Sequence, residues 1–243
     1  MMNRYLKKAA AVAAAGVLVL SLAACGQSGK TESKAESQAA ESAATESTAE
    51  AEKPGVVGGW TINKGDMLPA ANADAIAAYE KVSGELPGAS EPVAVIATQV
   101  VAGTNYCIMV RERAEGEEAA SALSLVYIYQ DLSGNASILQ KTAVTEDGLL
   151  GGFKVNEEEL AFGADETVKN AFEKATETLL GVNYEPIAYL AKQIVSGSNY
   201  MVLCRTTVVS PDAVPEFALV TIYEDLQGNA KFGESEPLRI GLN

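Results

Sequence analysis

Apolar residues run almost without interruption from Pro92 to Val110, and this run is too long for a single strand. As one strand it would span about 60 Å at ~3.3 Å per residue, whereas strands usually have roughly 3 to 10 residues. Gly103 is the only glycine inside the run, so the pattern predicts two strands that turn near it. The turn then lies in QVVAGTNY (99–106), although turns exposed to water normally carry Asn or Asp with polar neighbours.

The second half of the chain repeats the first. QVVAGTNY at 99–106 returns as QIVSGSNY at 193–200, and VYIYQDLSGNA at 126–136 returns as VTIYEDLQGNA at 220–230. Further upstream, GGW at 58–60 returns as GGF at 151–153. A repeat of this length corresponds to a domain and not to a solenoid unit. The sequence therefore predicts two homologous units, residues 55–147 and 148–243.

Both units show the same order of elements. Apolar residues at helical spacing predict helices at about 71–84, with Ile76, Ala77 and Tyr79 on the apolar side, and at about 165–180, with Asp165 as N-cap. Four strands follow each helix, and in one of them Tyr106 and Ile108 alternate with residues of the opposite face. One helix on an antiparallel meander is an α+β unit. The predicted strands are 92–101, 104–113, 121–131 and 136–144, then 186–195, 198–208, 216–225 and 230–240.

The first 24 residues have the pattern of an export signal. A basic start precedes an apolar stretch at 9–20, which is shorter than the roughly 20 residues that span a bilayer. LAACG at 22–26 resembles the cleavage box of bacterial lipoproteins, in which the cysteine carries the lipid; the alternative is an ordinary signal-peptidase site. We expect residues 1–24 to be a signal peptide, Cys25 to be the lipid attachment site, and the mature chain to be extracytoplasmic and lipid-anchored to the bacterial cell membrane. Residues 25–54, rich in Ala, Glu, Ser and Thr, are expected to be a disordered tether.

Composition excludes several classes of function. The chain has 32 acidic and 18 basic residues and a net charge of −14, which argues against nucleic acid or an anionic lipid surface as a partner. It has no histidine, so Ser-His and Cys-His nucleophile pairs and the usual zinc sites are excluded. We therefore expect no enzymatic activity, no metal and no cofactor, and we expect a monomer. Cys107 and Cys204 do not correspond between the repeats and are read as free thiols.

The motif residues now indicate a family. Gln99, Val101 and Gly103, followed by Asn105-Tyr106, resemble the first inhibitory hairpin of stefins, the disulfide-free branch of the cystatins. VVGGW at 56–60 is similar to their N-terminal trunk, and YIYQDLSGN at 127–135 to the strand that leads into their second hairpin. The resemblance implies an α+β fold of two tandem cystatin-like domains, each with one helix packed on an antiparallel sheet of four to five strands.

The same resemblance implies a function and a site. Cystatins inhibit papain-like cysteine proteases reversibly and competitively, with a trunk and two hairpin loops acting as a wedge in the active-site cleft. An apolar turn would then form the centre of an interface. In the second unit Leu149 and Leu150 would correspond to the trunk. The implied protease-binding residues are Val56, Val57, Gly58, Gly59, Gln99, Val100, Val101, Ala102, Gly103, Leu132, Ser133, Gly134, Gln193, Ile194, Val195, Ser196, Gly197, Leu226, Gln227 and Gly228.

Other interpretations of these residues stay open. The turn at 99–103 is also compatible with a plain β-turn, residues 132–134 with an ordinary Ser-Gly turn, and residues 193–197 with a copy retained only for structure. For the whole chain, the alternatives to an inhibitor are a non-inhibitory peptide- or protein-binding envelope lipoprotein and a structural envelope lipoprotein. The sequence does not name the target protease.

Overall fold

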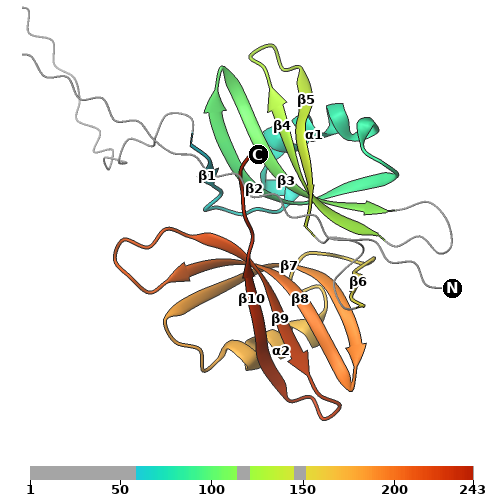
Figure 1. Cartoon of the computed structure of the whole chain (residues 1–243), viewed down its shortest axis with the longest axis vertical. Coiled ribbons are helices and arrows are strands. Elements are labelled where there is room, and N and C mark those ends of the chain that lie inside the picture. Colours follow the sequence, from blue (N-terminus) through green and yellow to red (C-terminus); the bar gives the residue numbers. More distant parts are fainter. Residues whose placement is uncertain (1–58, 114–120, 145–151, 243) are drawn as a thin grey trace, which may run out of the picture. The chain divides into compact units, whose positions relative to one another are not determined.

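The computed structural model describes residues 59–113, 121–144 and 152–242, and within them each repeat forms one five-stranded antiparallel sheet with one α-helix (Figure 1). The strands of each sheet lie in chain order, β1 to β5 in the first sheet and β6 to β10 in the second. The first sheet consists of β1 Thr61–Ile62, β2 Ala89–Val101, β3 Gly103–Arg113, β4 Ala122–Gln130 and β5 Ala136–Ala143. The second consists of β6 Lys154–Val155, β7 Val182–Val195, β8 Gly197–Val208, β9 Glu216–Glu224 and β10 Ala230–Pro237.

The helices follow the predicted periodicity with one correction. Helix α2 (Glu166–Thr176) begins as predicted, because the Asp165 carboxylate accepts hydrogen bonds from the main-chain N–H groups of the first turn. Helix α1 (Ala73–Val82) buries Tyr79 as predicted, but Ala77 is exposed and was assigned to the wrong face. Steps of three and four residues connect 75, 78, 79 and 82, which are the buried positions. Short 3₁₀ turns flank α1 at Pro69–Ala71 and Ser83–Glu85.

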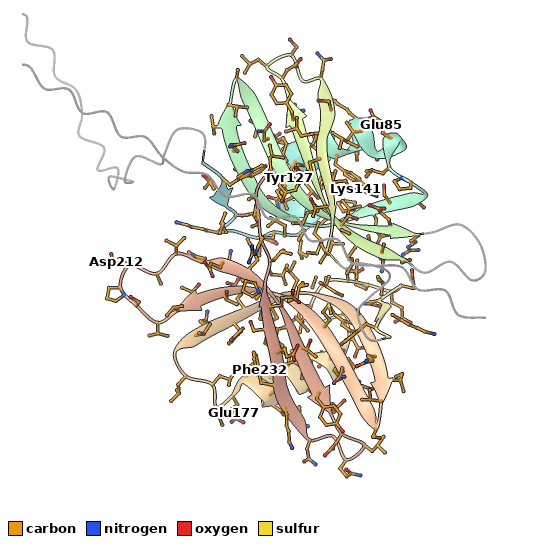
Figure 2. The ribbon with its side chains drawn as sticks, in the orientation of Figure 1. Glu85, Tyr127, Lys141, Glu177, Asp212 and Phe232 are labelled. Atoms are coloured by element: carbon orange, nitrogen blue, oxygen red, sulfur yellow. The ribbon has the colours of Figure 1, made fainter. Side chains whose placement is uncertain are left out.

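Each sheet is buried on both faces. In β3, Tyr106 and Ile108 belong to the core beneath α1, while Cys107 and Met109, on the opposite face, belong to a second core. This second core contains residues of both sheets, and Figure 2 labels one of them, Tyr127 of β4. The buried members from the β-strands of the two repeats are Val93, Ala94, Ile96, Ala97, Cys107, Met109, Leu123, Leu125 and Tyr127, with Val155, Ile187, Ala188, Leu190, Ala191, Leu203, Phe217 and Leu219.

The shared core corrects the predicted fold class. The prediction of two tandem cystatin-like domains, each a separate helix-on-sheet α+β unit, is wrong. The described residues are mostly antiparallel strand, with two five-stranded sheets and two α-helices, and they belong to one compact unit. The prediction placed a helix on one face of each sheet and assigned no cover to the other face. That second face is as apolar as the first, and the other repeat covers it.

Reciprocal hydrogen bonds connect the two repeats. Arg111 of β3 donates through Nη1 to two main-chain oxygens of the second repeat, and Arg205 of β8 donates through Nη1 to two main-chain oxygens of the first repeat at 3.1 Å each. Each arginine also pairs with a glutamate of its own sheet. Because repeat-equivalent arginines make equivalent contacts, the two repeats are related by a local two-fold arrangement. The four acceptors belong to Asn156, Glu158, Asn63 and Gly65.

Both cysteines of the described region are free and buried, which confirms the sequence prediction. Cys107 lies in the core between the sheets and Cys204 in the core beneath α2, so they lie in different cores. Burial raises the pKa of Cys107 to about 12 and also raises that of Cys204. Both thiols are therefore structural. A search of the described residues for a helix long and apolar enough to cross a membrane finds none.

Candidate functional site

The apolar motif forms an exposed turn at one end of the first sheet. Val101 pairs with Gly103, so the chain reverses at Ala102. Val100 is 76 % exposed and Val101 42 % exposed, although Val95 and Ile96 of the same strand are fully buried. The apolar residues of the turn therefore contribute little to the core. Exposed apolar residues of this kind are typical of an interface with another molecule.

Glycine is required at the turn by contacts inside the protein. Gly103 has φ +134°, and a Cβ at this position would overlap the main-chain oxygen of Gln130 at the end of β4. Gly197 has φ +130° and meets the main-chain oxygen of Glu224 in the same way. The glycine of the motif thus lets the β2–β3 turn approach β4 closely.

The glutamine of the motif has an internal partner. Asn105 Nδ2 donates a 2.6 Å hydrogen bond to Gln99 Oε1 across the β2–β3 pair, and Asn199 donates to Gln193 in the second repeat. Both glutamines are half-buried. This bond explains why the motif extends to Asn105 and Asn199: the two amides hold the strands together below the exposed turn.

The β4–β5 turn lies beside the β2–β3 turn. Its Leu132 is exposed, as is Ser133, and the turn is held by the Asp131 carboxylate, which accepts 2.8 Å hydrogen bonds from the main-chain N–H groups of Ser133 and Asn135. The Asn135 side chain also donates to Asp131 and, as the largest contribution, lowers the pKa of that carboxyl. Lys81 of α1 donates to the main-chain oxygen of Gly134. The turn is therefore preformed in the free chain.

A tyrosine connects the two turns. Tyr129 of β4 donates a 2.7 Å hydrogen bond to the main-chain oxygen of Ala102, and Thr104 pairs with Gln130 in the register of β3 and β4. Two apolar loops predicted from the sequence to act together are thus neighbours at the same end of the sheet. We call this set, residues 100–103 and 131–135, the first edge.

The first described residues lie near the same edge. Thr61 of β1 pairs with Thr98, and continuing this antiparallel register places Trp60 and the exposed Gly59 beside the last residues of β2. Trp60 packs against Tyr127 with ring centroids 5.4 Å apart, so it anchors the segment as expected of a packing residue. The remaining trunk residues and the lipid site fall outside the described residues: Val56, Val57, Gly58, Leu149, Leu150 and Cys25.

The second repeat forms the same arrangement, called the second edge (residues 194–197 and 225–229). Ile194, Val195 and Leu226 are exposed. The hydrogen bonds of the first edge also recur here. Tyr223 donates to the main-chain oxygen of Ser196, and Lys174 donates to the main-chain oxygen of Gly228. The Asp225 carboxylate accepts hydrogen bonds from the main-chain N–H groups of Gln227 and Asn229. Asn229 lowers the pKa of Asp225.

The two edges differ in charge beside the turns. Lys154 of β6 stands directly opposite Lys192 of β7, where the first repeat has Thr61 opposite Thr98. Like charges in cross-strand positions destabilise a sheet. The edges therefore present different electrostatic surroundings to a binding partner.

The residues that position each edge were not predicted from the sequence. They are the tyrosine that bonds to the turn, the aspartate and asparagine that close the next turn, and the lysine from the helix. Their signal was present, because each recurs between the repeats in YQDLSGN and YEDLQGN or in AYEK and AFEK. In the first repeat they are Tyr129, Asp131, Asn135 and Lys81.

The acidic and cysteine side chains of the described residues form no metal site. No group of three or more Cys, Asp or Glu side chains in them could hold a metal ion. The acidic run Glu157–Glu159 is exposed, and its main-chain oxygens accept hydrogen bonds from Arg111 (at Glu158) and Arg113 (at Glu157). A cavity of about 460 Å³ between β4–β5 and the chain end after β10 has mainly apolar lining residues, among them Leu125, Met201 and Leu219. It contains no residue of either edge.

Comparisons with known proteins add no identification. No family model and no curated protein matches the chain. Among solved structures, an Ntf2-like protein involved in plasmid conjugation is similar at 12 % sequence identity, over 63 % of this chain and 80 % of that chain, with a TM-score of 0.21. A similarity at this score carries no argument about fold or function.

Proposed function

We propose that the chain is a reversible, competitive inhibitor of papain-like cysteine proteases, and that the first edge enters the active-site cleft of the protease. The observation that supports this most directly is the position of the turns. Two hairpin turns with exposed apolar residues lie side by side, and Gly59, the first described residue, lies on the same side of the sheet as these turns. A projecting row of this kind complements a cleft.

The edge also meets the energetic requirement for tight binding. Ordering a loop when it binds costs free energy, and this cost limits the affinity of flexible loops. Here Tyr129 holds Ala102, and Asp131 holds Ser133 and Asn135, before any partner arrives. Nanomolar affinity, about −12 kcal/mol, is within reach of a preformed interface of ordinary size.

The test is a titration of papain activity with the full chain, purified in detergent, at several substrate concentrations. We expect tight inhibition that rising substrate relieves. In a chain whose second edge already carries Val195→Asp, adding Val101→Asp should lower the affinity at least 100-fold, because a carboxylate would be desolvated in the cleft. Val209→Asp in the same background is the matched control, since Val209 is also an exposed valine (77 %, against 42 % for Val101) but lies in the loop after β8.

The outcomes separate the candidate functions. Equal inhibition by the Val101→Asp and Val209→Asp chains would show that the first edge does not bind the protease. No inhibition by a folded chain would refute the proposal, and the non-inhibitory protein-binding lipoprotein would then be the better interpretation.

A further inference from the structure

The two edges lie far from the arginine hydrogen bonds that join the repeats. Gly103 and Arg111 are eight residues apart on β3, so about 26 Å separates the first turn from Arg111 at ~3.3 Å per residue. Gly197 and Arg205 have the same separation on β8. Because Arg111 and Arg205 make the reciprocal hydrogen bonds between the repeats, each edge lies at the remote end of its own sheet.

The edges also face opposite ways. Figure 1 shows the turns after β2 and β4 at one end of the described structure, and the turns after β7 and β9 at the other end. The local two-fold arrangement accounts for this, because Arg111 contacts Asn156 while Arg205 contacts the repeat-equivalent Asn63. A two-fold axis between the repeats carries one edge onto the other and leaves both pointing outward.

Neither repeat covers the edge of the other. Val101 is 42 % exposed and its counterpart Val195 45 %, while Leu132 is 89 % exposed and Leu226 81 %. Each edge also has its own tyrosine hydrogen bond that preforms the turn, from Tyr129 in the first edge and from Tyr223 in the second. Both edges are therefore open and preformed in the same chain.

We infer that one chain binds two protease molecules at the same time, one on each edge, with no contact between them. The nature of the partner rests on the proposed function, whereas the number of partners rests on the geometry of the edges. Two sites that face opposite ways bind independently, so occupation of one edge leaves the affinity of the other unchanged. The chain then acts as a bridge between two protease molecules.

The test is the stoichiometry of papain binding to the full chain in detergent. Active papain is held far above its dissociation constant and titrated with the chain, and the mass of the complex is measured by analytical ultracentrifugation. We expect complete inhibition at one chain per two papain molecules. Val101→Asp and Val195→Asp should each reduce this to one papain per chain, and the double variant should bind none.

Controls and contrary results distinguish the inference from the function on which it rests. Val209→Asp should keep two papain molecules per chain, and circular dichroism checks that every variant is folded. One papain per unmodified chain, abolished by Val101→Asp and unaffected by Val195→Asp, would overturn the inference and leave the proposed function intact. One papain per chain for the unmodified protein and for both single variants would show that the edges exclude each other, which also overturns it. No binding by the unmodified chain would overturn the proposed function itself.

Discussion

Replacing Arg111 by alanine tests whether the repeats depend on each other for stability. The Arg111 side chain is 3 % exposed, pairs with Glu91, and donates to the main-chain oxygens of Asn156 and Glu158. A hydrogen bond to a charged group contributes roughly 1.5–3 kcal/mol. Two such bonds between the repeats contribute about 3–6 kcal/mol. Arg111 Nε is buried without a partner among the described residues, and this desolvation cost of about 1–3 kcal/mol, which the alanine variant no longer has, is subtracted. We expect Arg111→Ala to lower the free energy of unfolding by about 3 kcal/mol.

Urea unfolding measures this with two probes. Trp60 is the only tryptophan and packs against Tyr127, so its fluorescence reports the first repeat, whereas circular dichroism reports both sheets. Because the sheets share a core, the two probes should give the same transition in the unmodified chain. At a slope of about 2 kcal/mol per molar urea, Arg111→Ala should lower the midpoint by about 1.5 M.

Arg113→Ala is the matched control for this experiment. Arg113 is two residues further along β3 and also donates a 3.1 Å hydrogen bond to the second repeat, at the main-chain oxygen of Glu157, but this bond is exposed to solvent. Its side chain is 43 % exposed, with ion pairs of 3.4 Å to Glu91 and 3.8 Å to Glu157. Exposed ion pairs contribute at most about 1 kcal/mol. An equal loss in both variants, or separate transitions for the two probes in the unmodified chain, would refute the reasoning that Arg111 holds two interdependent repeats together.

Two further predictions concern titrating groups. The pKa of Asp131 is lowered in the folded chain, so its contribution to the turn is fully present above its unfolded pKa of about 3.9 and is lost as the pH falls through the lowered value. The amide resonance of Ser133, which donates to this carboxylate, should therefore titrate with a midpoint below 3.9 in NMR spectra; a midpoint at or above 3.9 would contradict the assignment. Cys107 and Cys204 are buried and Cys107 has a pKa of about 12, so iodoacetamide at pH 8 should modify both only in urea, as read by peptide mass spectrometry, and rapid modification of the native chain would contradict their burial.

Individual elements of the fold could be predicted because local patterns repeat. The two copies of the motif, the alternation along β3 and the Asp165 cap each follow from nearby residues. The packing of the sheets could not be predicted in the same way. In β3 every residue from Asn105 to Glu112 is buried, which indicates that both faces are covered. One helix covers one face only, and the identity of the second cover depends on contacts between residues more than 40 positions apart in the chain, such as Arg111 with Asn156.

The candidate site was also predicted only in part. The exposed residues Val100, Val101 and Leu132 were predicted from the motif, because apolar residues at a turn are conspicuous. Gln99 was assigned to a partner surface, and the structure shows that it accepts a hydrogen bond from Asn105. A glutamine in a motif can serve either purpose, and only the register of the strands, which places Gln99 opposite Asn105, distinguishes them.

The apolar turns persist in water because polar contacts beneath them determine their conformation. Tyr129 fixes the carbonyl of Ala102, and the Gln99–Asn105 pair joins the strands directly below. The valines are therefore not needed to hold the turn, and they contribute little to the core because Val100 is 76 % exposed and Val101 42 %. Their free energy of burial becomes available only when a partner covers them, at about 25 cal/mol per Å² of apolar area. This separation of conformation from contact residues explains how the second edge can exchange Ala102 for Ser196 and keep the same turn.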